Sequence, residues 1–280
     1  MKVALTGATG FLGRHVQAAL CARGLDVTAM VRPGPKAPVL STGVRPASMD
    51  MDDAGPDTFE RLGRPDVLVH LAWGGLPNYA ATTHLDVELP RQLRFLEACV
   101  KGGLKNLIVT GTCLEYGMRE GELHEGMPAQ PTTAYAIAKH RLHEHVDGWR
   151  AERGLALAWL RVFYLHGPGQ APSSLYAQLN AAIDRGDARF PMSAGDQVRD
   201  FMPVEKAATA IAALARLNAD PGTVNLCSGV PIRVVDIARR WVDARGASIV
   251  LDTGHFPYPA YEPFSFWGNR SRLDHLMESP

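Results

Sequence analysis

A glycine-rich turn directly after a short apolar strand constrains this chain more than any other feature. The apolar residues 3–5 are typical of a buried strand, and the run TGATGFLG leads from it straight into a helical pattern. Such a turn gathers backbone N–H groups and the positive end of a helix at one point, where a pyrophosphate can bind. We expect Gly7 to allow the tight turn, Gly10 to let phosphates approach the backbone, and Gly13 to let the helix pack on the strand. The spacing is G-x-x-G-x-x-G, which taken alone also fits an ordinary turn.

A second motif, YAIAK from Tyr135 to Lys139, lies far downstream. Residues 134–150 have a helical composition, so side chains four positions apart share a face. We expect the Lys139 ammonium to stabilise the Tyr135 phenolate and lower its pKa, which makes the tyrosine a proton donor and acceptor near neutral pH. A surface Tyr-Lys pair is the simpler interpretation of this motif alone, but the N-terminal glycine turn favours the catalytic one.

Strand-like apolar runs alternate with helical stretches along most of the chain. This alternation predicts an α/β fold with a Rossmann-type doubly wound parallel sheet, whose ligands bind at the carboxyl ends of the strands. Residues 1–166 and about 198–228 are expected to form the dinucleotide-binding domain. The Pro- and aromatic-rich residues of about 167–197 and 229–280 are expected to form a smaller C-terminal substrate lobe, in which the proline-rich 255–263 runs extended as a strap or lid. The expected strands are residues 3–6, 26–31, 67–71, 107–110, 156–161 and 223–226, and the expected helices are 12–23, 86–102, 135–151 and 205–218.

Charge and composition narrow the classes of partner. The 280 residues carry 29 basic and 29 acidic side chains, so no basic field favours nucleic acid or an anionic membrane. No apolar run reaches membrane-spanning length, and a strand that begins at residue 2 or 3 leaves no room for a signal peptide. The four cysteines are widely spaced without metal or disulfide patterning. We therefore expect reduced thiols and a cytoplasmic protein that binds neither nucleic acid nor membrane.

The end of the second expected strand bears on which dinucleotide binds. An NAD site usually places an acidic residue about 20 positions after the glycines, on the ribose 2′-hydroxyl. Here Asp26 lies at the beginning of that strand and Arg32 follows its end, while Arg14 directly follows Gly13. These two arginines favour pairing with a 2′-phosphate, so we expect NADP(H) to be preferred, with NAD(H) as the alternative. The competing interpretation is that both are ordinary surface arginines.

Four more segments complete a recognisable series: residues 66–72 (DVLVHLA), 112–117 (TCLEYG), 161–168 (RVFYLHGP) and 199–201 (RDF). With the glycine turn and the Tyr-x-x-x-Lys pair, they resemble the extended short-chain dehydrogenase/reductase family, in its sugar-nucleotide epimerase, dehydratase and reductase branch, over nearly the whole chain. The resemblance implies three catalytic residues: Tyr135 as proton donor, Lys139 as its tuning partner and ribose contact, and Thr112 as a hydrogen-bond donor to the reacting oxygen. It also implies cofactor contacts by Gly7, Thr9, Gly10, Phe11, Leu12, Gly13, Arg14, Arg32, Asp50, Met51, Leu71, Ala72, Trp73, Thr110, Tyr135 and Lys139.

The branch contains several reactions, and the residues beside Thr112 help to separate them. The 4,6-dehydratases of the branch carry Thr-Asp-Glu at this place, whereas this chain has Thr-Cys-Leu, which lacks the acid and base that elimination needs. The chain resembles reductases of nucleotide-activated 4-keto-6-deoxysugars, so we expect a 4-keto reductase that takes a nucleotide sugar. A nucleotide-sugar epimerase is the alternative, and a non-catalytic NADP(H) sensor is disfavoured because Thr112, Tyr135 and Lys139 are all present.

Substrate contacts follow from the same resemblance. Arg199 suits phosphate oxygens, while the aromatic residues are expected either to cover the sugar or to form the core of the lobe. Many relatives have Asn where Tyr164 stands and Tyr where His166 stands, which leaves the identity of the sugar open. The expected substrate contacts are Cys113, Tyr164, His166, Arg199, Tyr261 and Trp267.

The helix segment 140–145 (HRLHEH) is rich in histidine. It matches neither H-E-x-x-H nor H-x-x-E-H, and a metal site needs a third ligand and supporting contacts. We therefore expect no metal, and a solvated or dimer-facing helix instead. The resemblance implies a homodimer that packs through this helix and the helix near 86–102.

Overall fold

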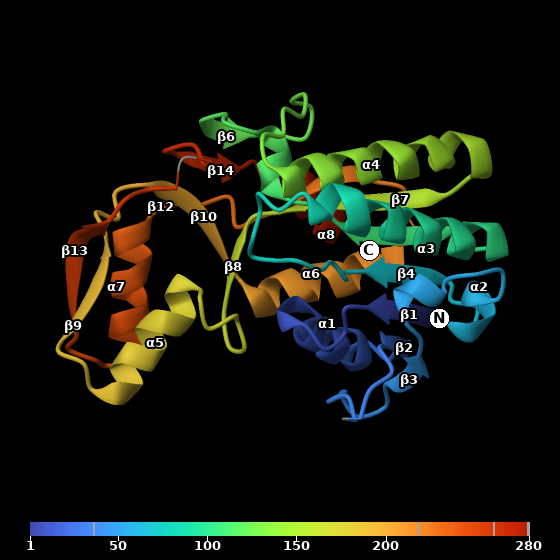
Figure 1. The fold of residues 1–280 in the computed structure, drawn as a ribbon, viewed down its shortest axis with the longest axis horizontal. Coiled ribbons are helices and arrows are strands. Elements are labelled where there is room, and N and C mark those ends of the chain that lie inside the picture. The colour runs from blue at the N-terminus through green and yellow to red at the C-terminus, as the bar shows by residue number, and fades with distance from the viewer. Residues whose placement is uncertain (36, 218, 260, 279–280) are drawn as a thin grey trace.

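A computed structural model describes residues 1–35, 37–217, 219–259 and 261–278. Asn218 and Ala260, which fall within segments interpreted above, lie outside this set. A seven-stranded sheet forms the centre of the larger part of the molecule (Figure 1), with the spatial order β11-β7-β5-β4-β1-β2-β3. Every neighbouring pair in it is parallel. The strands are β1 (Lys2–Thr6), β2 (Asp26–Val31), β3 (Arg45–Ser48), β4 (Val67–His70), β5 (Asn106–Thr110), β7 (Ala156–Val162) and β11 (Gly222–Leu226).

Two hydrophobic cores cover the two faces of this sheet. Along β1, Val3 and Leu5 join one core while Ala4 joins the other, as the alternation of side chains in a strand requires. The first core packs α1 (Phe11–Ala22), α6 (Val204–Leu217) and α8 (Ser271–Glu278) on one face, and the second packs α3 (Leu89–Gly102) and α4 (Ala134–Arg153) on the other. The predicted doubly wound α/β fold is confirmed. The sheet order reverses between β1 and β4, so the binding crevice is expected there.

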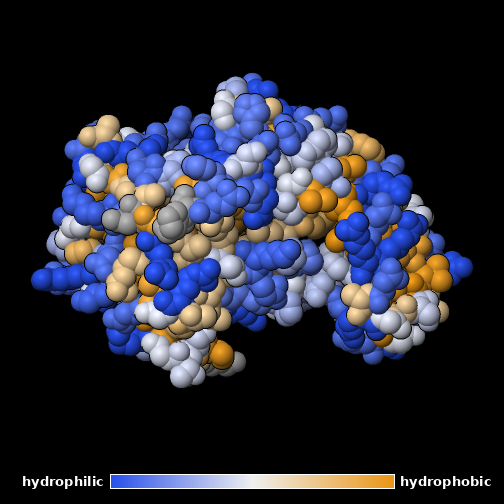
Figure 2. Space-filling view, turned by 180° about the vertical axis from the view of Figure 1, so that it is seen from behind, coloured by the Kyte–Doolittle hydropathy of each residue, from blue (hydrophilic) through white to orange (hydrophobic). Residues whose placement is uncertain are grey.

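A smaller lobe projects from one end of the sheet (Figure 1). Its core joins Leu179, Phe190, Val235 and Trp241. Seen from behind, the surface is deeply indented between the lobe and the larger part (Figure 2). The lobe is built from α5 (Leu175–Arg185), β9 (Arg189–Ser193), α7 (Val234–Ala244) and β13 (Val250–Phe256).

Short strands connect the two parts. A three-stranded sheet holds β12 (Pro231–Arg233), β10 (Val198–Pro203) and β8 (Tyr164–His166), and a two-stranded one pairs β14 (Phe266–Gly268) with β6 (Gly121–Leu123). The short elements near the sheet edge are η1 (Met51–Asp53), α2 (Thr58–Arg61), η2 (His84–Glu88) and η3 (Cys113–Tyr116). Helix α8, which the sequence interpretation grouped with the lobe, packs instead on β11 and α6. Among the described helices, none is long and apolar enough to cross a membrane.

Candidate active site

The glycine turn joins β1 to α1 and presses against the end of β4. Gly7 has a φ of +69°, and a Cβ there would lie 2.8 Å from the backbone nitrogen of Ala72. A Cβ on Gly13 would lie 2.0 Å from the carbonyl oxygen of Gly7. The Gly10 N–H donates to the same oxygen at 3.0 Å. The turn therefore needs glycine at both Gly7 and Gly13, and it aims the N-terminus of α1 into the crevice.

A pocket opens at this turn, at the carboxyl ends of β1, β2 and β4. Its walls include four residues that the sequence interpretation did not name: Gly74, Glu88, Arg91 and Gln92. The predicted cofactor residues Phe11, Leu12, Gly13 and Arg14 belong to the first turn of α1 beside it. Nine of the predicted cofactor contacts line the pocket itself, namely Gly7, Thr9, Gly10, Arg32, Asp50, Met51, Leu71, Ala72 and Trp73.

A second hollow adjoins the first and shares Thr9, Val31 and Arg32 with it. Arg14 lines this hollow opposite the segment 37–39. Asp26, at the other end of β2, forms an ion pair with Arg45 at 2.5 Å. The two arginines thus flank one space, and the only acid of β2 is bound elsewhere.

A buried chain of hydrogen bonds ties the floor of the pocket together. Thr6 Oγ1 lies 2.9 Å from His70 Nδ1, and His70 Nε2 lies 2.6 Å from Gln92 Oε1. Gln92 Nε2 donates to Glu88 Oε2 at 3.1 Å, and the Gly74 N–H donates to the same oxygen at 3.0 Å. Burial, with the Lys139 charge, lowers the pKa of His70 to about 3, so the ring is neutral and fixed between its partners. The spacing of Glu88 and Gln92 on one helical face was a signal for this network, but their partners on β1 and β4 are distant in sequence.

Lys139 lies beside the pocket, on the buried face of α4. Its Nζ donates to the carbonyl oxygen of Thr110 at 2.7 Å and stands 4.0 Å from the centre of the Trp73 ring. Trp73 in turn donates from Nε1 to His84 Nδ1 at 3.1 Å. Burial lowers the pKa of Lys139 to about 7, against the opposing charges of Glu115 and Glu88.

Tyr135 stands one helical turn before Lys139, in an aromatic cage. Its ring centre lies 5.3 Å from that of His84, 5.5 Å from that of Tyr79 and 5.9 Å from that of Trp73. Burial raises the pKa of Tyr135 far above its usual range, and a hydrogen-bonding contact with the Thr112 side chain opposes the rise. The expectation that Lys139 lowers this pKa is therefore wrong for the structure described here, because desolvation outweighs every neighbouring group. The structure nonetheless brings Tyr135, Lys139 and Thr112 together.

Thr112 is held by a capping box at the start of η3. Its Oγ1 accepts the Leu114 N–H at 3.3 Å, while the Thr112 N–H donates to Glu115 Oε1 at 2.9 Å. The buried Glu115 also accepts from Trp159 Nε1 at 3.0 Å and from Arg161 Nε at 3.2 Å, both on β7. Sequence reasoning missed Glu115, although a Thr-x-x-Glu spacing is a capping-box signature.

The residues expected to contact substrate fall into two groups. Cys113, Tyr164, Arg199 and Tyr261 gather on the side of Tyr135 that faces the C-terminal segment, where Tyr79 lies 5.6 Å from Tyr261 between ring centres. His166 instead packs among aromatic residues of the lobe, 5.2 Å from Trp241 and 5.7 Å from Tyr176 between ring centres. Trp267 lies on β14, opposite Glu122 of β6.

Arg199 is buried, with a side chain only 2% exposed. Its Nη1 donates to the carbonyl oxygens of Val198 at 2.8 Å and Phe264 at 2.9 Å, and its Nη2 donates to Glu262 Oε2 at 3.0 Å. The predicted diphosphate contact by Arg199 stays a prediction, and in this structure the guanidinium bonds protein acceptors.

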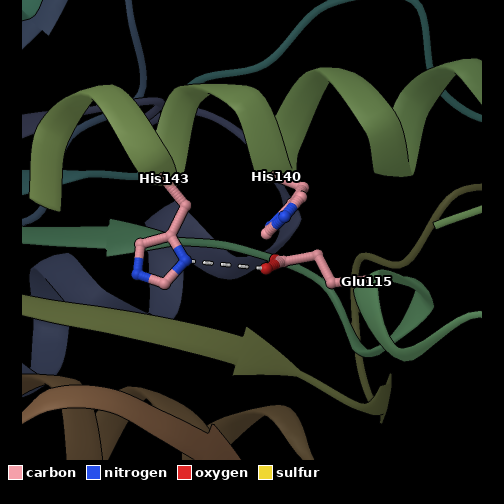
Figure 3. Close-up of side chains that lie close together, drawn as sticks. All are labelled: Glu115, His140 and His143. Carbon is pink, nitrogen blue, oxygen red and sulfur yellow. Dashed lines mark ion pairs between the residues drawn. The ribbon is translucent and has the colours of Figure 1, made fainter. Parts of the chain in front are cut away.

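The histidine-rich segment of α4 does acquire a third neighbour (Figure 3). Ligand atoms of Glu115, His140 and His143 lie within 4.8 Å of one another, and His143 Nδ1 is 4.0 Å from Glu115 Oε2. The same carboxylate oxygen already accepts from the buried Arg161 guanidinium. A divalent cation here would place further positive charge beside that guanidinium at a buried position, which is unfavourable. The absence of a metal stays an expectation, now with a physical reason.

A pocket at a glycine turn between a parallel strand and a helix, with a tyrosine, a lysine and a threonine gathered beside it, is typical of a dinucleotide-dependent oxidoreductase of Rossmann type. The chain belongs to the NAD dependent epimerase/dehydratase family, whose model matches residues 3–227.

Relatives and solved structures similar to this chain include proteins named as sugar-nucleotide dehydrogenases, epimerases and dehydratases. The dTDP-6-deoxy-L-talose 4-dehydrogenase (NAD(+)) of Aggregatibacter actinomycetemcomitans is 26% identical over 96% of this chain and 99% of its own length. The dTDP-6-deoxy-L-talose 4-dehydrogenase (NAD(P)(+)) of Kitasatospora kifunensis is 28% identical over 81% of this chain and 74% of its own. MoeE5, solved with UDP-glucuronic acid and NAD, superposes with a TM-score of 0.83 at 23% identity, covering 99% of this chain and 92% of its own. The protein is therefore an NAD(P)-dependent oxidoreductase with the fold of this family.

Proposed function

We propose that the protein is an NADP(H)-preferring 4-keto reductase of a nucleotide-activated 4-keto-6-deoxysugar, in deoxysugar biosynthesis. The observation that carries the proposal is the meeting of Tyr135, Thr112 and Lys139 beside a pocket that the glycine turn shapes. Two relatives over most of the chain are named as 4-dehydrogenases of a dTDP-linked 6-deoxysugar. Reduction at C4 of a 4-keto-6-deoxysugar is that reaction run backward.

The residues suit a reaction in which a carbonyl becomes an alcohol. NADPH, when bound in the pocket, would supply the hydride. The Tyr135 hydroxyl donates its proton to the oxygen at C4, and the raised pKa of this phenol keeps the proton in place until the oxygen becomes basic. Thr112 Oγ1 hydrogen-bonds the same oxygen and thereby fixes the carbonyl in front of Tyr135. Lys139, fixed by its bond to the Thr110 carbonyl oxygen, holds the nicotinamide ribose.

The preference for NADP(H) rests on the hollow next to the main pocket. Arg14 and Arg32 flank it, and no acid of β2 reaches it because Asp26 pairs with Arg45. A 2′-phosphate fits between two guanidinium groups. NAD(H) is the alternative, in line with the cofactor named for one of the two relatives.

Consumption of NADPH in the presence of dTDP- and GDP-4-keto-6-deoxyhexoses tests the proposal. We expect loss of NADPH absorbance in proportion to sugar reduced, and a product whose NMR spectrum shows a new hydroxyl at C4. An inverted sugar formed without net use of NADPH would establish the epimerase instead. A homodimer through α3 and α4 and a cytoplasmic location belong to the same proposal, and light scattering of the purified protein tests the dimer.

A further inference from the structure

The C-terminal segment between β13 and β14 places one carboxylate beside the proposed substrate site. Glu262 Oε2 accepts from Arg199 Nη2 at 3.0 Å, and the two side chains are 12% and 2% exposed. The other face of Arg199 packs on the Phe266 ring, 4.7 Å from its centre. Both N–H groups of Arg199 Nη1 donate to backbone carbonyl oxygens. Among the hydrogen bonds described for Arg199, the bond to Glu262 is therefore the one made to a charged group.

The surroundings of Glu262 show which side of the catalytic tyrosine it faces. Tyr79 lies in ring contact with Tyr135, and the Glu262 charge contributes, after burial, to raising the pKa of Tyr79 to about 12. The same charge contributes to the raised pKa of Cys113, the residue directly after Thr112. Tyr261, the residue before Glu262, contacts the Tyr79 ring, which itself contacts Tyr135, so Glu262 lies among the residues around the proposed substrate site.

Tyr164 adds a second polar group to this place. Its hydroxyl is buried and lies within hydrogen-bonding reach of the Glu262 carboxylate, which adds to the effect of burial in raising the pKa of Tyr164. A ligand here would therefore meet the Tyr164 hydroxyl and the Glu262 carboxylate. The positive charge of Arg199 is already neutralised by its ion pair with Glu262.

We propose that Glu262 is a specificity residue that selects a neutral glycosyl group and rejects a glycuronosyl one, with Arg199 holding it in position. A sugar hydroxyl can donate to the carboxylate, whereas a sugar carboxylate would meet a like charge in a poorly hydrated space. This inference rests on the proposed function, because it concerns the nucleotide sugar of that same site.

A matched pair of ligands tests the inference. UDP-glucose and UDP-glucuronic acid share the base and diphosphate and differ by the carboxylate at C6, so the ratio of their dissociation constants isolates that group. We expect calorimetry on the wild-type enzyme with NADP⁺ to give at least about tenfold weaker binding of UDP-glucuronic acid, which is the direction that like-charge repulsion imposes. In Glu262→Gln the ratio should fall toward one.

Two controls keep the outcomes distinct. Glu120→Gln removes an exposed carboxylate that bonds the Phe264 N–H of the same segment, and it should leave the ratio unchanged. The inference is overturned if the ratio of dissociation constants is near one in the wild type, or if it is unchanged in a folded Glu262→Gln. In either case, reduction of neutral keto sugars would still support the proposed function. If Glu262→Gln does not fold, the wild-type ratio decides the matter. Binding of neither ligand overturns the inference, whereas NADPH consumption with the keto sugars still decides the proposed function.

Discussion

Replacement of Lys139 by methionine should abolish turnover and at the same time stabilise the protein below neutral pH. A pKa lowered from 10.5 to about 7 corresponds to about 5 kcal/mol of unfavourable free energy for the buried ammonium, at about 1.36 kcal/mol per unit. The methionine loses the bond to the Thr110 carbonyl, worth about 1.5–3 kcal/mol, and the Trp73 contact, worth about 0.5–1 kcal/mol. The net gain in the free energy of unfolding at pH 6 is therefore about 1–3 kcal/mol.

The sign of the pH dependence follows from proton uptake. Between the folded pKa of about 7 and the unfolded pKa of 10.5, the unfolded chain holds more protons on Lys139 than the folded one does. The wild-type free energy of unfolding thus rises with pH across this window, and Lys139→Met lacks this contribution. The stability advantage of the variant should shrink by about 1.5 kcal/mol between pH 7 and pH 8.5.

Urea unfolding of both proteins at pH 6, 7 and 8.5, followed by circular dichroism, measures this difference. Titration of the cysteines and histidines is common to both proteins and cancels in the comparison. Lys101→Met is the matched control, because Lys101 is exposed on α3 and pairs with Glu97, and it should show no such pH dependence. A Lys139→Met protein that is less stable than wild type at pH 6, or whose stability difference ignores pH, would refute the reasoning.

Three other substitutions, one of them with a matched control at Gly148, probe the pocket and its supports. Arg32→Asp should shift the kcat/KM ratio of NADPH to NADH by at least about tenfold toward NADH, as expected for the loss of a charge-assisted phosphate contact; an unchanged ratio argues against the NADP(H) proposal. Gly13→Ala should destabilise by about 1–3 kcal/mol because its Cβ meets the Gly7 carbonyl oxygen, whereas Gly148→Ala, open to space on α4, should stabilise by up to about 1 kcal/mol. Equal thermal shifts in the two alanine variants would contradict this account of the turn. Glu115→Gln should lower the free energy of unfolding in urea by about 3–5 kcal/mol, as expected when a buried pair with Arg161 is broken, and a loss under about 1 kcal/mol would show that the pair is not needed.

Local pattern carried most of the fold prediction. Apolar strands, helical stretches and the glycine turn are short-range signals, and alternation of strand and helix leaves few arrangements other than a parallel sheet. The end of the chain was harder to place. Helix α8 follows an irregular segment, and it returns to the main sheet through Leu273, which joins the core under α6, with Leu276 and Met277 packed against that core.

In the candidate site, too, residues of local motifs were predicted and contacts between distant segments were not. Tyr135 and Lys139 were predicted because both lie on one helix, and Thr112 because it belongs to a compact motif. Contacts that join distant segments were not predictable: Glu262 meets Arg199 across 63 positions, and His70 meets Gln92 through strand and helix packing. The electrostatics were also misjudged, since the sequence shows the charge of Lys139 but not the burial that dominates the pKa values of Tyr135 and Lys139.

Turnover by Tyr135→Phe tests the central claim most directly. The phenyl ring keeps the contacts with Trp73, Tyr79 and His84, so the variant should fold and bind NADPH as wild type does. Loss of the proton donor should reduce kcat for the 4-keto sugar by about 10²–10⁴-fold, while Tyr176→Phe in the lobe should leave it unchanged. A Tyr135→Phe enzyme within about threefold of the wild-type kcat, far short of the loss expected on removing a general acid, would contradict the account.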